Sequence, residues 1–238
     1  MDTNVFISSE PKPRKEADRL LPARSPKERC PRVVAFLDIM GFKDMVSRQS
    51  ETKIDEKLYV LTSFISSNVR DGFIQFSVFS DSIIIFSSDL SLNSFKQIVN
   101  LVASIMAKSI SLGLPIKGAI ASGECTVTND KTPYYFGQPI IDAYLLEENV
   151  EMYGVVLHHT VENLAVESTN DSDLVFDYLT KFRGGESMHY VVNWFGNNYE
   201  ENEKNINAIR FNVSDSARRY IDATKKCFSF WKKKSVQC

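Results

Sequence analysis

The segment Val33-Val34-Ala35-Phe36-Leu37-Asp38-Ile39-Met40-Gly41-Phe42 decides the fold, together with Phe76-Ser77-Val78-Phe79-Ser80-Asp81-Ser82-Ile83-Ile84-Ile85-Phe86. Each is an apolar run rich in β-branched and aromatic residues, a pattern that predicts a buried strand. Each also carries one aspartate at the point where the strand ends or turns. A lone carboxylate beside a buried strand is costly to keep without a partner or a cation.

A tight hairpin is predicted in the second segment, with strands at 76–79 and 83–86 around Ser80-Asp81-Ser82. This hairpin brings a second carboxylate, so Asp38 and Asp81 can meet at one sheet edge and hold a divalent metal ion. Either aspartate alone also has a purely structural explanation, because Asp and Ser side chains often cap backbone groups in turns. The other motifs of the chain favour the metal-binding interpretation over the structural one.

The composition is that of an ordinary globular protein. The 238 residues are 43% hydrophobic, which suits one domain of about 160 to 200 residues with extensions. A formal net charge of −2 argues against bulk electrostatic binding of nucleic acid or a membrane. No run approaches about 18 apolar residues and no signal peptide pattern is present, so we expect no membrane span. The four cysteines lack CxxC or zinc spacing, which predicts reduced thiols and a cytoplasmic protein.

Three regions follow one another along the chain. Residues 1–31 hold five of the eight prolines among charged residues, a composition that predicts a flexible tail. Residues 32–195 carry the strand and helix patterns of one α/β domain. Residues 196–238 form a helical C-terminal extension whose amphipathic part, 213–234, has a basic end. We interpret this end as a solvated surface rather than a nucleic-acid or membrane contact.

The order of elements predicts a ferredoxin-like α+β sandwich with a mostly antiparallel sheet. Helices are expected over 42–50, 54–69, 91–112, 137–149 and 160–166. Further strands are expected at 116–125, 153–157 and 188–195, with a second hairpin around Asn129-Asp130. The predicted buried side of the 137–149 helix consists of Ile140, Ile141, Tyr144 and Leu145.

Four motifs in this order resemble those of the class III nucleotidyl cyclases. The 36–42 segment resembles the first-strand pattern Phe-x-Asp-Ile-x-Gly-Phe, and Asp81 matches the second metal aspartate. The 116–123 segment is similar to the family's Arg-x-Gly-Ile-x-x-Gly strand, and Gly137 to the glycine that opens its interfacial helix. Each motif is weak alone, but the set is specific and covers roughly residues 32–150.

Within that family, three segments are most similar to the bacterial Pycsar cyclases: 80–82, 118–124 and 143–147. Those enzymes make cyclic UMP or cyclic CMP in anti-phage defence. The resemblance therefore implies a uridylate or cytidylate cyclase, a lyase that converts UTP or CTP to the 3′,5′-cyclic monophosphate and pyrophosphate.

The resemblance also implies roles for individual residues. Asp38 and Asp81 would ligate two Mn²⁺ or Mg²⁺ ions, and the carbonyl of Ile39 would complete one coordination shell. Backbone N–H groups from Ile39 to Phe42, including that of Gly41, would bind phosphate oxygens. The nearest basic candidates for charge on the α-phosphate are Lys117 and Lys43, although both also fit the pattern of solvated lysines.

The departures from the family pattern concern the base and the transition state. Ile141 and Leu145 stand where the family's helix carries Asn and Arg. Ser77 and Tyr134 stand where adenine-specific members carry Lys and Asp. The hydroxyls of Ser77 and Tyr134 and the bulk of the Tyr134 ring favour a pyrimidine base over a purine. They do not decide between UTP and CTP as the substrate.

Two alternatives are a degenerate cyclase-like domain that binds nucleotide without turnover, and a diguanylate cyclase or polymerase palm. The second lacks its Gly-Gly-Asp/Glu-Glu-Phe hairpin here. The resemblance further implies a head-to-tail homodimer. In that dimer each site takes Asp38 and Asp81 from one subunit, and Ser77 and Tyr134 from the other.

Overall fold

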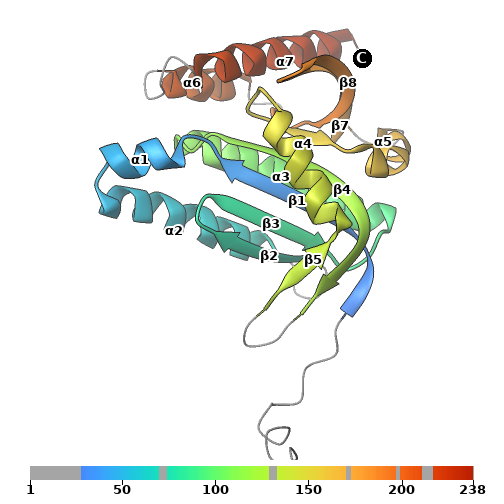
Figure 1. The fold of residues 1–238 in the computed structure, drawn as a ribbon. Coiled ribbons are helices and arrows are strands. Elements are labelled where there is room, and N and C mark those ends of the chain that lie inside the picture. The colour runs from blue at the N-terminus through green and yellow to red at the C-terminus, as the bar shows by residue number, and fades with distance from the viewer. Residues whose placement is uncertain are drawn as a thin grey trace, which may run out of the picture.

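The protein is represented by a computed structural model that describes residues 28–69, 74–128, 133–169, 173–196, 199–210 and 217–237 (Figure 1). The strands are β1 (Glu28–Ile39), β2 (Ile74–Phe79), β3 (Ser82–Ser87), β4 (Ile116–Val127), β5 (Tyr135–Gly137), β6 (Val155–Leu157), β7 (Val175–Phe182) and β8 (Gly185–Val192). The helices are α1 (Phe42–Arg48), α2 (Glu51–Asn68), α3 (Leu92–Ser111), α4 (Gln138–Asn149), the short 3₁₀ helix η2 (His159–Val161), α5 (Glu162–Thr169), α6 (Tyr199–Ile209) and α7 (Arg218–Gln237).

Strand β1 lies in the middle of the sheet, between β3 and β4. It pairs antiparallel with β3 from Val34↔Phe86 to Asp38↔Ser82, and with β4 along its whole length. Gly118 of β4 allows this close packing, because a Cβ there would lie 2.6 Å from the carbonyl oxygen of Phe36. The sheet order is β2-β3-β1-β4-β6-β8-β7, with β5 paired to β4.

The two sides of the sheet are covered differently. Side chains of β1 alternate, and Val33, Ala35, Leu37 and Ile39 are at most 1% exposed. They belong to the main apolar core, which also contains buried residues of the long helices α2 and α3. Helix α4 crosses the other side, where Tyr144 meets Phe36 edge-on with ring centroids 5.5 Å apart (Figure 1). We call the α2–α3 side the closed face and the α4 side the open face.

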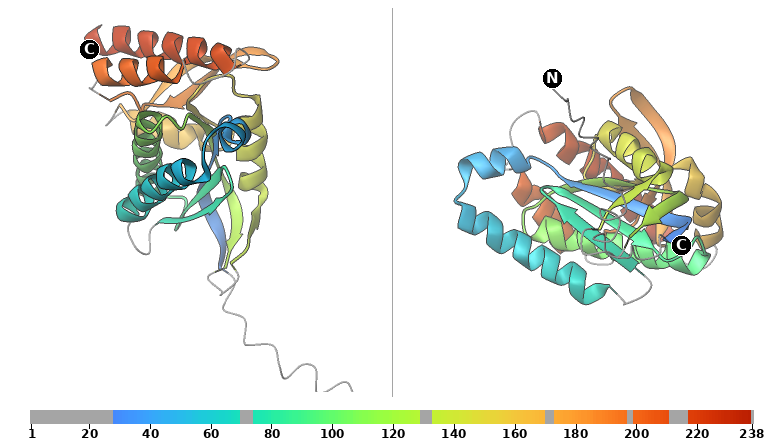
Figure 2. Two further views of the ribbon diagram at one scale, coloured as in Figure 1. Left: turned by 90° about the vertical axis from the view of Figure 1, so that its left-hand side faces the viewer. Right: turned by 60° about the horizontal axis from the view of Figure 1, so that its bottom comes forward.

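The C-terminal elements lie beyond the β6 edge of the central strands. Strands β7 and β8 form a hairpin, and β8 pairs with β6. Helices α6 and α7 pack against each other at this end of the molecule, above α1 and α3 (Figure 2). No helix among the described residues is long and apolar enough to cross a membrane.

The structure confirms the predicted fold class and most predicted elements. Strand β1 begins at Glu28, inside the segment predicted as tail, because it continues pairing with β4 as far as Val127. The rest of that tail lies outside the described residues, as do Asn129-Asp130 of the second hairpin and the start of the predicted 213–234 helix. Strand β7 was not predicted, helix α6 lies in the predicted helical extension although no bounds were given for it, and β8 begins and ends three residues before the predicted strand.

One prediction about burial is wrong. Ile141, Tyr144 and Leu145 were expected on the buried side of α4, yet they are 50%, 42% and 50% exposed. The buried residues of α4 are Pro139, Ala143 and Glu147, spaced four apart. The apolar stripe therefore points away from its own chain, which single-chain periodicity cannot distinguish from a buried stripe.

Candidate active site

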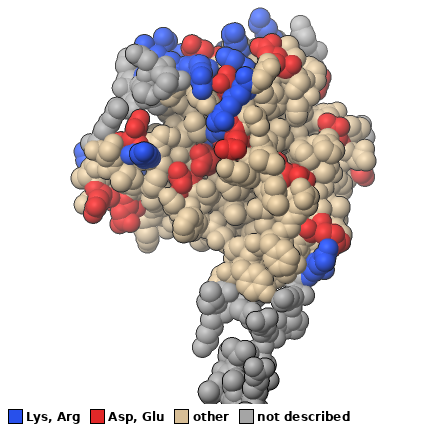
Figure 3. Space-filling view, in the orientation of Figure 1, with Lys and Arg blue, Asp and Glu red and all other residues tan. Residues whose placement is uncertain are grey.

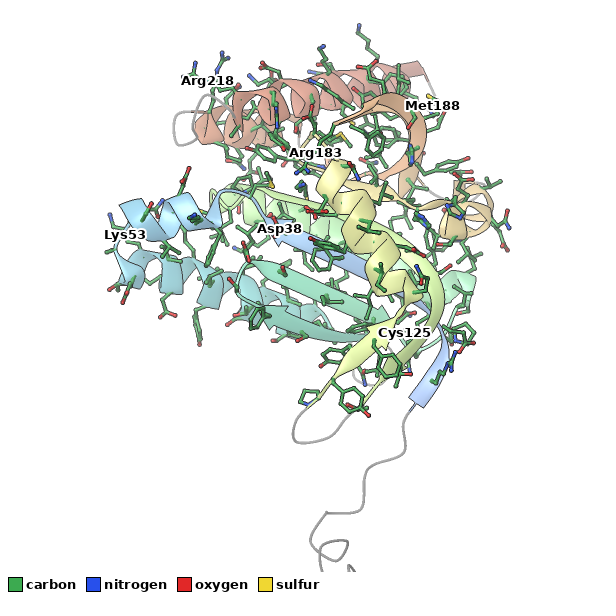
Figure 4. All side chains as sticks on the ribbon, in the orientation of Figure 1. Asp38, Lys53, Cys125, Arg183, Met188 and Arg218 are labelled. Atoms are coloured by element: carbon green, nitrogen blue, oxygen red, sulfur yellow. The ribbon has the colours of Figure 1, made fainter. Side chains whose placement is uncertain are left out.

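Asp38 and Asp81 meet at the end of β1. Asp38 pairs with Ser82 of β3 on one side and with Lys117 of β4 on the other. The N–H of Ile39 donates a 2.9 Å hydrogen bond to the carbonyl oxygen of Asp81, which fixes the hairpin tip beside β1. Figure 4 shows Asp38 on the open face, beside α4. The two aspartates are thus neighbours at the end of β1, and their role as metal ligands stays a prediction.

The environment of Asp38 is one that a cation would stabilise. The pKa of Asp38 is raised to about 6, first by burial and then by the negative charge of Asp81, while the positive charge of Lys117 opposes both. A half-buried carboxylate facing a second one is costly while both are ionised. Two carboxylates and backbone carbonyls are an oxygen donor set that suits Mg²⁺ or Mn²⁺.

The same residues do not form a complete metal cage. Among the described residues, no group of three or more His, Cys, Asp or Glu side chains is placed to hold a metal ion. Mg²⁺ is commonly bound by one or two carboxylates, with substrate phosphates and water as its other ligands. The residues present therefore fit a metal that binds together with a phosphate substrate.

The loop after β1 limits which backbone groups can bind phosphate. The N–H of Met40 donates to the carbonyl oxygen of Pro115 at 2.8 Å, and that of Ile39 is already bound to Asp81. Gly41 adopts φ 73°, a left-handed conformation that favours glycine, and it starts α1. Of the four predicted N–H donors, those of Gly41 and Phe42 remain for phosphate. Lys43 follows them with an exposed side chain.

Lys117 is buried in a contact that the sequence did not predict. Its ammonium lies 2.9 Å from Oε1 of Glu147, with both side chains about 95% buried. It also donates to the carbonyl oxygens of Glu147 at 2.9 Å and Glu148 at 3.4 Å. This ion pair and the two hydrogen bonds hold the C-terminal turn of α4 against β4. The predicted phosphate role of Lys117 remains a prediction with this competing contact.

Glu147 is the functional neighbour that sequence reasoning missed. Burial raises its pKa, and the positive charge of Lys117 lowers it. A signal was available, because Glu147 continues the Pro139-Ala143 stripe that faces the core. A carboxylate on a buried stripe needs a cation, and Lys117 stands in a strand whose other residues, apart from Glu124, are apolar or small.

Ser77 and Tyr134, the two residues predicted to contact the base, are not among the cross-strand neighbours of Asp38. Ser77 is half-buried on β2 and pairs with Ile84, which pairs with Phe36. It is therefore on the open face, two strand positions from Asp38. Tyr134 precedes β5 and stacks on Phe136 with ring centroids 6.2 Å apart. No described contact joins either side chain to Asp38 or Asp81.

The open face carries a group of exposed apolar side chains, which we call the apolar patch. Phe79 pairs with Ser82, the partner of Asp38, and it is 82% exposed. The other members are 42–50% exposed: Ile141, Tyr144 and Leu145. Figure 3 shows this side as mostly uncharged residues, whereas Lys and Arg gather over the α6–α7 end. Tyr134 and Phe136 are also exposed, but Phe136 pairs through Thr126 with Arg29, on the alternation of Val33 and Ala35, so this ring pair lies on the opposite side of the sheet.

Comparison with known proteins identifies the fold. No family model and no curated protein matches the sequence. Among solved structures, the adenylyl cyclase CyaB from P. aeruginosa matches with a TM-score of 0.55 and 18% identity, over 71% of this chain and 97% of its own. The guanylate cyclase domain of RhGC from Catenaria anguillulae, in complex with GTP, gives 0.53 and 17%, over 70% and 98%.

A third match is the monomeric guanylyl cyclase domain of the RhoGC fusion protein from Blastocladiella emersonii, with a TM-score of 0.56 and 15% identity. It covers 71% of this chain and 98% of that domain. More than a quarter of this chain thus lies outside the part that matches. The chain has the fold of the class III adenylyl and guanylyl cyclase catalytic domains.

Proposed function

We propose that this protein is a nucleotidyl cyclase that converts UTP or CTP to its 3′,5′-cyclic monophosphate and pyrophosphate. The meeting of Asp38 and Asp81 at the end of β1, within a cyclase fold, is the observation that carries this proposal. Its motif resemblance to the Pycsar cyclases further supports a role in bacterial anti-phage defence, with the cyclic nucleotide as a second messenger.

The residues of this chain would bind and orient the triphosphate. Asp38, Asp81 and the carbonyl of Ile39 would hold Mg²⁺ or Mn²⁺ ions. When bound, such ions lower the pKa of the ribose 3′-hydroxyl and offset charge on the phosphates. The N–H groups of Gly41 and Phe42 would donate to phosphate oxygens. The half-buried setting of Asp38 strengthens these electrostatic contacts by limiting water.

The proposed pyrimidine preference rests on Ser77 and Tyr134. The hydroxyl of Ser77 can donate to or accept from a uracil or cytosine edge. The ring of Tyr134 would fill space that a purine needs. Because hydroxyls pair with both amide and amine edges, some exchange between UTP and CTP is expected.

A homodimer with shared sites explains the exposed apolar patch. Ile141, Tyr144 and Leu145 form a stripe along α4 that a second chain would cover, and Phe79 adds to it beside the aspartates. A two-fold axis would then create two equivalent sites, each using Asp38 and Asp81 of one chain and Ser77 and Tyr134 of the other.

The substrate is tested by incubating the purified protein with each of four labelled nucleoside triphosphates and Mn²⁺, and resolving the products. We expect cyclic UMP or cyclic CMP as the main product. Faster cyclisation of ATP or GTP would contradict the pyrimidine assignment.

The residues at two positions of α4 favour a second candidate function. The two positions where the family carries Asn and Arg hold exposed Ile141 and Leu145, and Lys117 is engaged by Glu147. A cyclase-like domain that binds nucleotide without turnover has this pattern. Saturable binding of UTP or CTP without any cyclic product from all four nucleotides would favour this function over the first.

The shared site is tested by mixing two variants. Asp81→Ala and Tyr134→Ala are each expected to be impaired, but a mixed dimer places both lesions in one site and leaves the other intact. With random exchange of subunits, about a quarter of wild-type activity returns. If subunits exchange and no activity returns, the metals and the base are bound by the same chain.

A further inference from the structure

A cavity lies between the central domain and the C-terminal helices, and Gly41, one of the two proposed phosphate donors, is at its rim. Its volume is about 610 Å³, within the range of small-molecule sites. Its wall includes the loop after β1, the last turn of α3, and parts of α2, α6 and α7. Neither Asp38 nor Asp81 is among its lining residues.

One wall residue has an unfilled hydrogen-bonding capacity. Tyr153 is 1% exposed, and its hydroxyl has no hydrogen-bond partner among the described residues. Its ring stacks on that of Tyr220, with centroids 5.9 Å apart. Burial raises the pKa of Tyr153, so the hydroxyl keeps its proton and acts as a donor. Buried polar groups without a partner are uncommon, and each calls for a water or a ligand acceptor.

The charged groups of the wall favour an anion. Lys57 is half-buried on α2 and has no ion-pair partner in the part of the chain that the structure describes. Its ammonium lies near the end of α3, 3.7 Å from where a Cβ on Gly113 would stand. Arg219 lies over the Tyr220 ring at 5.2 Å and is paired with Glu151 at 3.3 Å. Because Glu151 already pairs with Arg219, Lys57 is the cation left to face a ligand, and Asp44 is the one acidic residue among the described lining residues.

The remaining wall is apolar. Met40, Met45, Ile110, Leu112, Pro115 and Ile209 line it, and thioether and branched side chains adapt to a flat apolar body. We propose that this cavity binds a small organic acid with an aromatic body, whose anionic oxygens face Lys57 and accept from Tyr153 once that side chain shifts to bring its buried hydroxyl to the cavity wall. Such a ligand would give the Tyr153 hydroxyl a hydrogen-bond acceptor. The aromatic ring of the ligand would be buried between the central domain and helices α6 and α7.

The proposal is tested on the full chain with the fluorescent aromatic sulfonate 1-anilinonaphthalene-8-sulfonate. We expect saturable binding of one dye per chain. Its uncharged analogue, N-phenyl-1-naphthylamine, is expected to bind at least about 5-fold more weakly, because it lacks the anion. This readout needs no turnover, so it is independent of the proposed cyclase activity.

Three variants locate the dye. Ala208 lines the cavity on α6 with an exposed side chain, so Ala208→Trp fills the space with little strain and is expected to weaken binding by more than about 10-fold. Tyr153→Phe and Lys57→Gln keep the shape and remove one polar contact each, for an expected loss of about 5-fold. A thermal melt of each variant shows that it is folded.

The matched control is Phe79→Ser, which removes an exposed aromatic from the open face. It is expected to leave dye affinity unchanged. If Phe79→Ser abolishes binding while Ala208→Trp does not, the dye sits on the apolar patch and the proposal is wrong. Displacement of the dye by inorganic triphosphate with Mn²⁺ would assign the cavity to the substrate instead. If neither dye binds, the cavity holds water only, and the proposal is overturned.

Discussion

The closed and open faces of the sheet are built from the same strands but do different work. On β1, Leu37 and Ile39 enter the main core beneath α2 and α3, while Asp38 between them faces α4. Successive side chains of a strand point to opposite faces. Asp38 can therefore take part in the proposed reaction while Leu37 and Ile39 pack in the core. Substitutions on the two faces should therefore separate loss of activity from loss of stability.

The largest effect is expected at the open face. Asp81→Ala removes a carboxylate proposed to ligate both ions, so turnover falls by at least about 100-fold while the thermal melt is unchanged. Asp55→Ala is the matched control, because Asp55 is exposed on α2. Product formation with Mn²⁺ gives the result. More than a tenth of wild-type turnover in a folded Asp81→Ala protein would contradict the metal assignment.

The variant Lys117→Met tests the rule that open-face substitutions affect activity and closed-face substitutions affect stability. Lys117 is on the open face, yet its substitution is expected to lower stability. It leaves Glu147 buried without its cation, which costs about 3–5 kcal/mol in the free energy of unfolding. The double variant Lys117→Met/Glu147→Leu is expected to recover most of that loss. Urea denaturation measures both. A stable Lys117→Met protein that loses only activity would show instead that Lys117 contacts the substrate.

A matched pair of truncations compares the faces directly. Leu37→Ala opens a cavity in the closed face and is expected to cost about 2–5 kcal/mol, with turnover per folded molecule retained. Phe79→Ala changes the free energy of unfolding by less than about 0.5 kcal/mol, because the ring is 82% exposed. It is expected to weaken self-association in sedimentation experiments. The reverse pattern would mean that the patch is needed for folding.

The smallest effect concerns pH. The pKa of Asp38 is raised to about 6 from 3.8, so its ionised form destabilises the metal-free fold above pH 6, and protonation relieves this as pH falls toward 3.8. Asp38→Asn is expected to add about 1–2 kcal/mol at pH 8 with chelator present. The gain over wild type shrinks to near zero by about pH 4. A gain that is equal at both pH values would contradict this origin.

Local patterns predicted the central fold and the aspartate pair. The β1 segment, the Asp81 hairpin and helix α3 have a clear apolar pattern, which depends only on neighbours in sequence, whereas the patterns of α2 and α4 are weaker. Strand β7 was missed because Asp177, Thr180 and Lys181 interrupt its apolar pattern. Helix α6 is rich in Glu and Asn and has little apolar signal.

The contacts of the site were harder to predict. Lys117 and Glu147 are 30 residues apart, so their pairing depends on how α4 folds back over β4. The exposure of Ile141 and Leu145 was missed for a related reason. An apolar stripe looks the same in sequence whether it is covered by its own chain or by a second one.

Strand β1 also works as a rod. It runs unbroken from Glu28 to Ile39, about 36 Å at the usual rise per residue, and β4 is bonded along all of it. Its far end carries Asp38, while its near end is joined directly to the first 27 residues of the chain. A pull or a push on the chain just before Glu28 is therefore delivered along a stiff element to the aspartates, without passing through any loop.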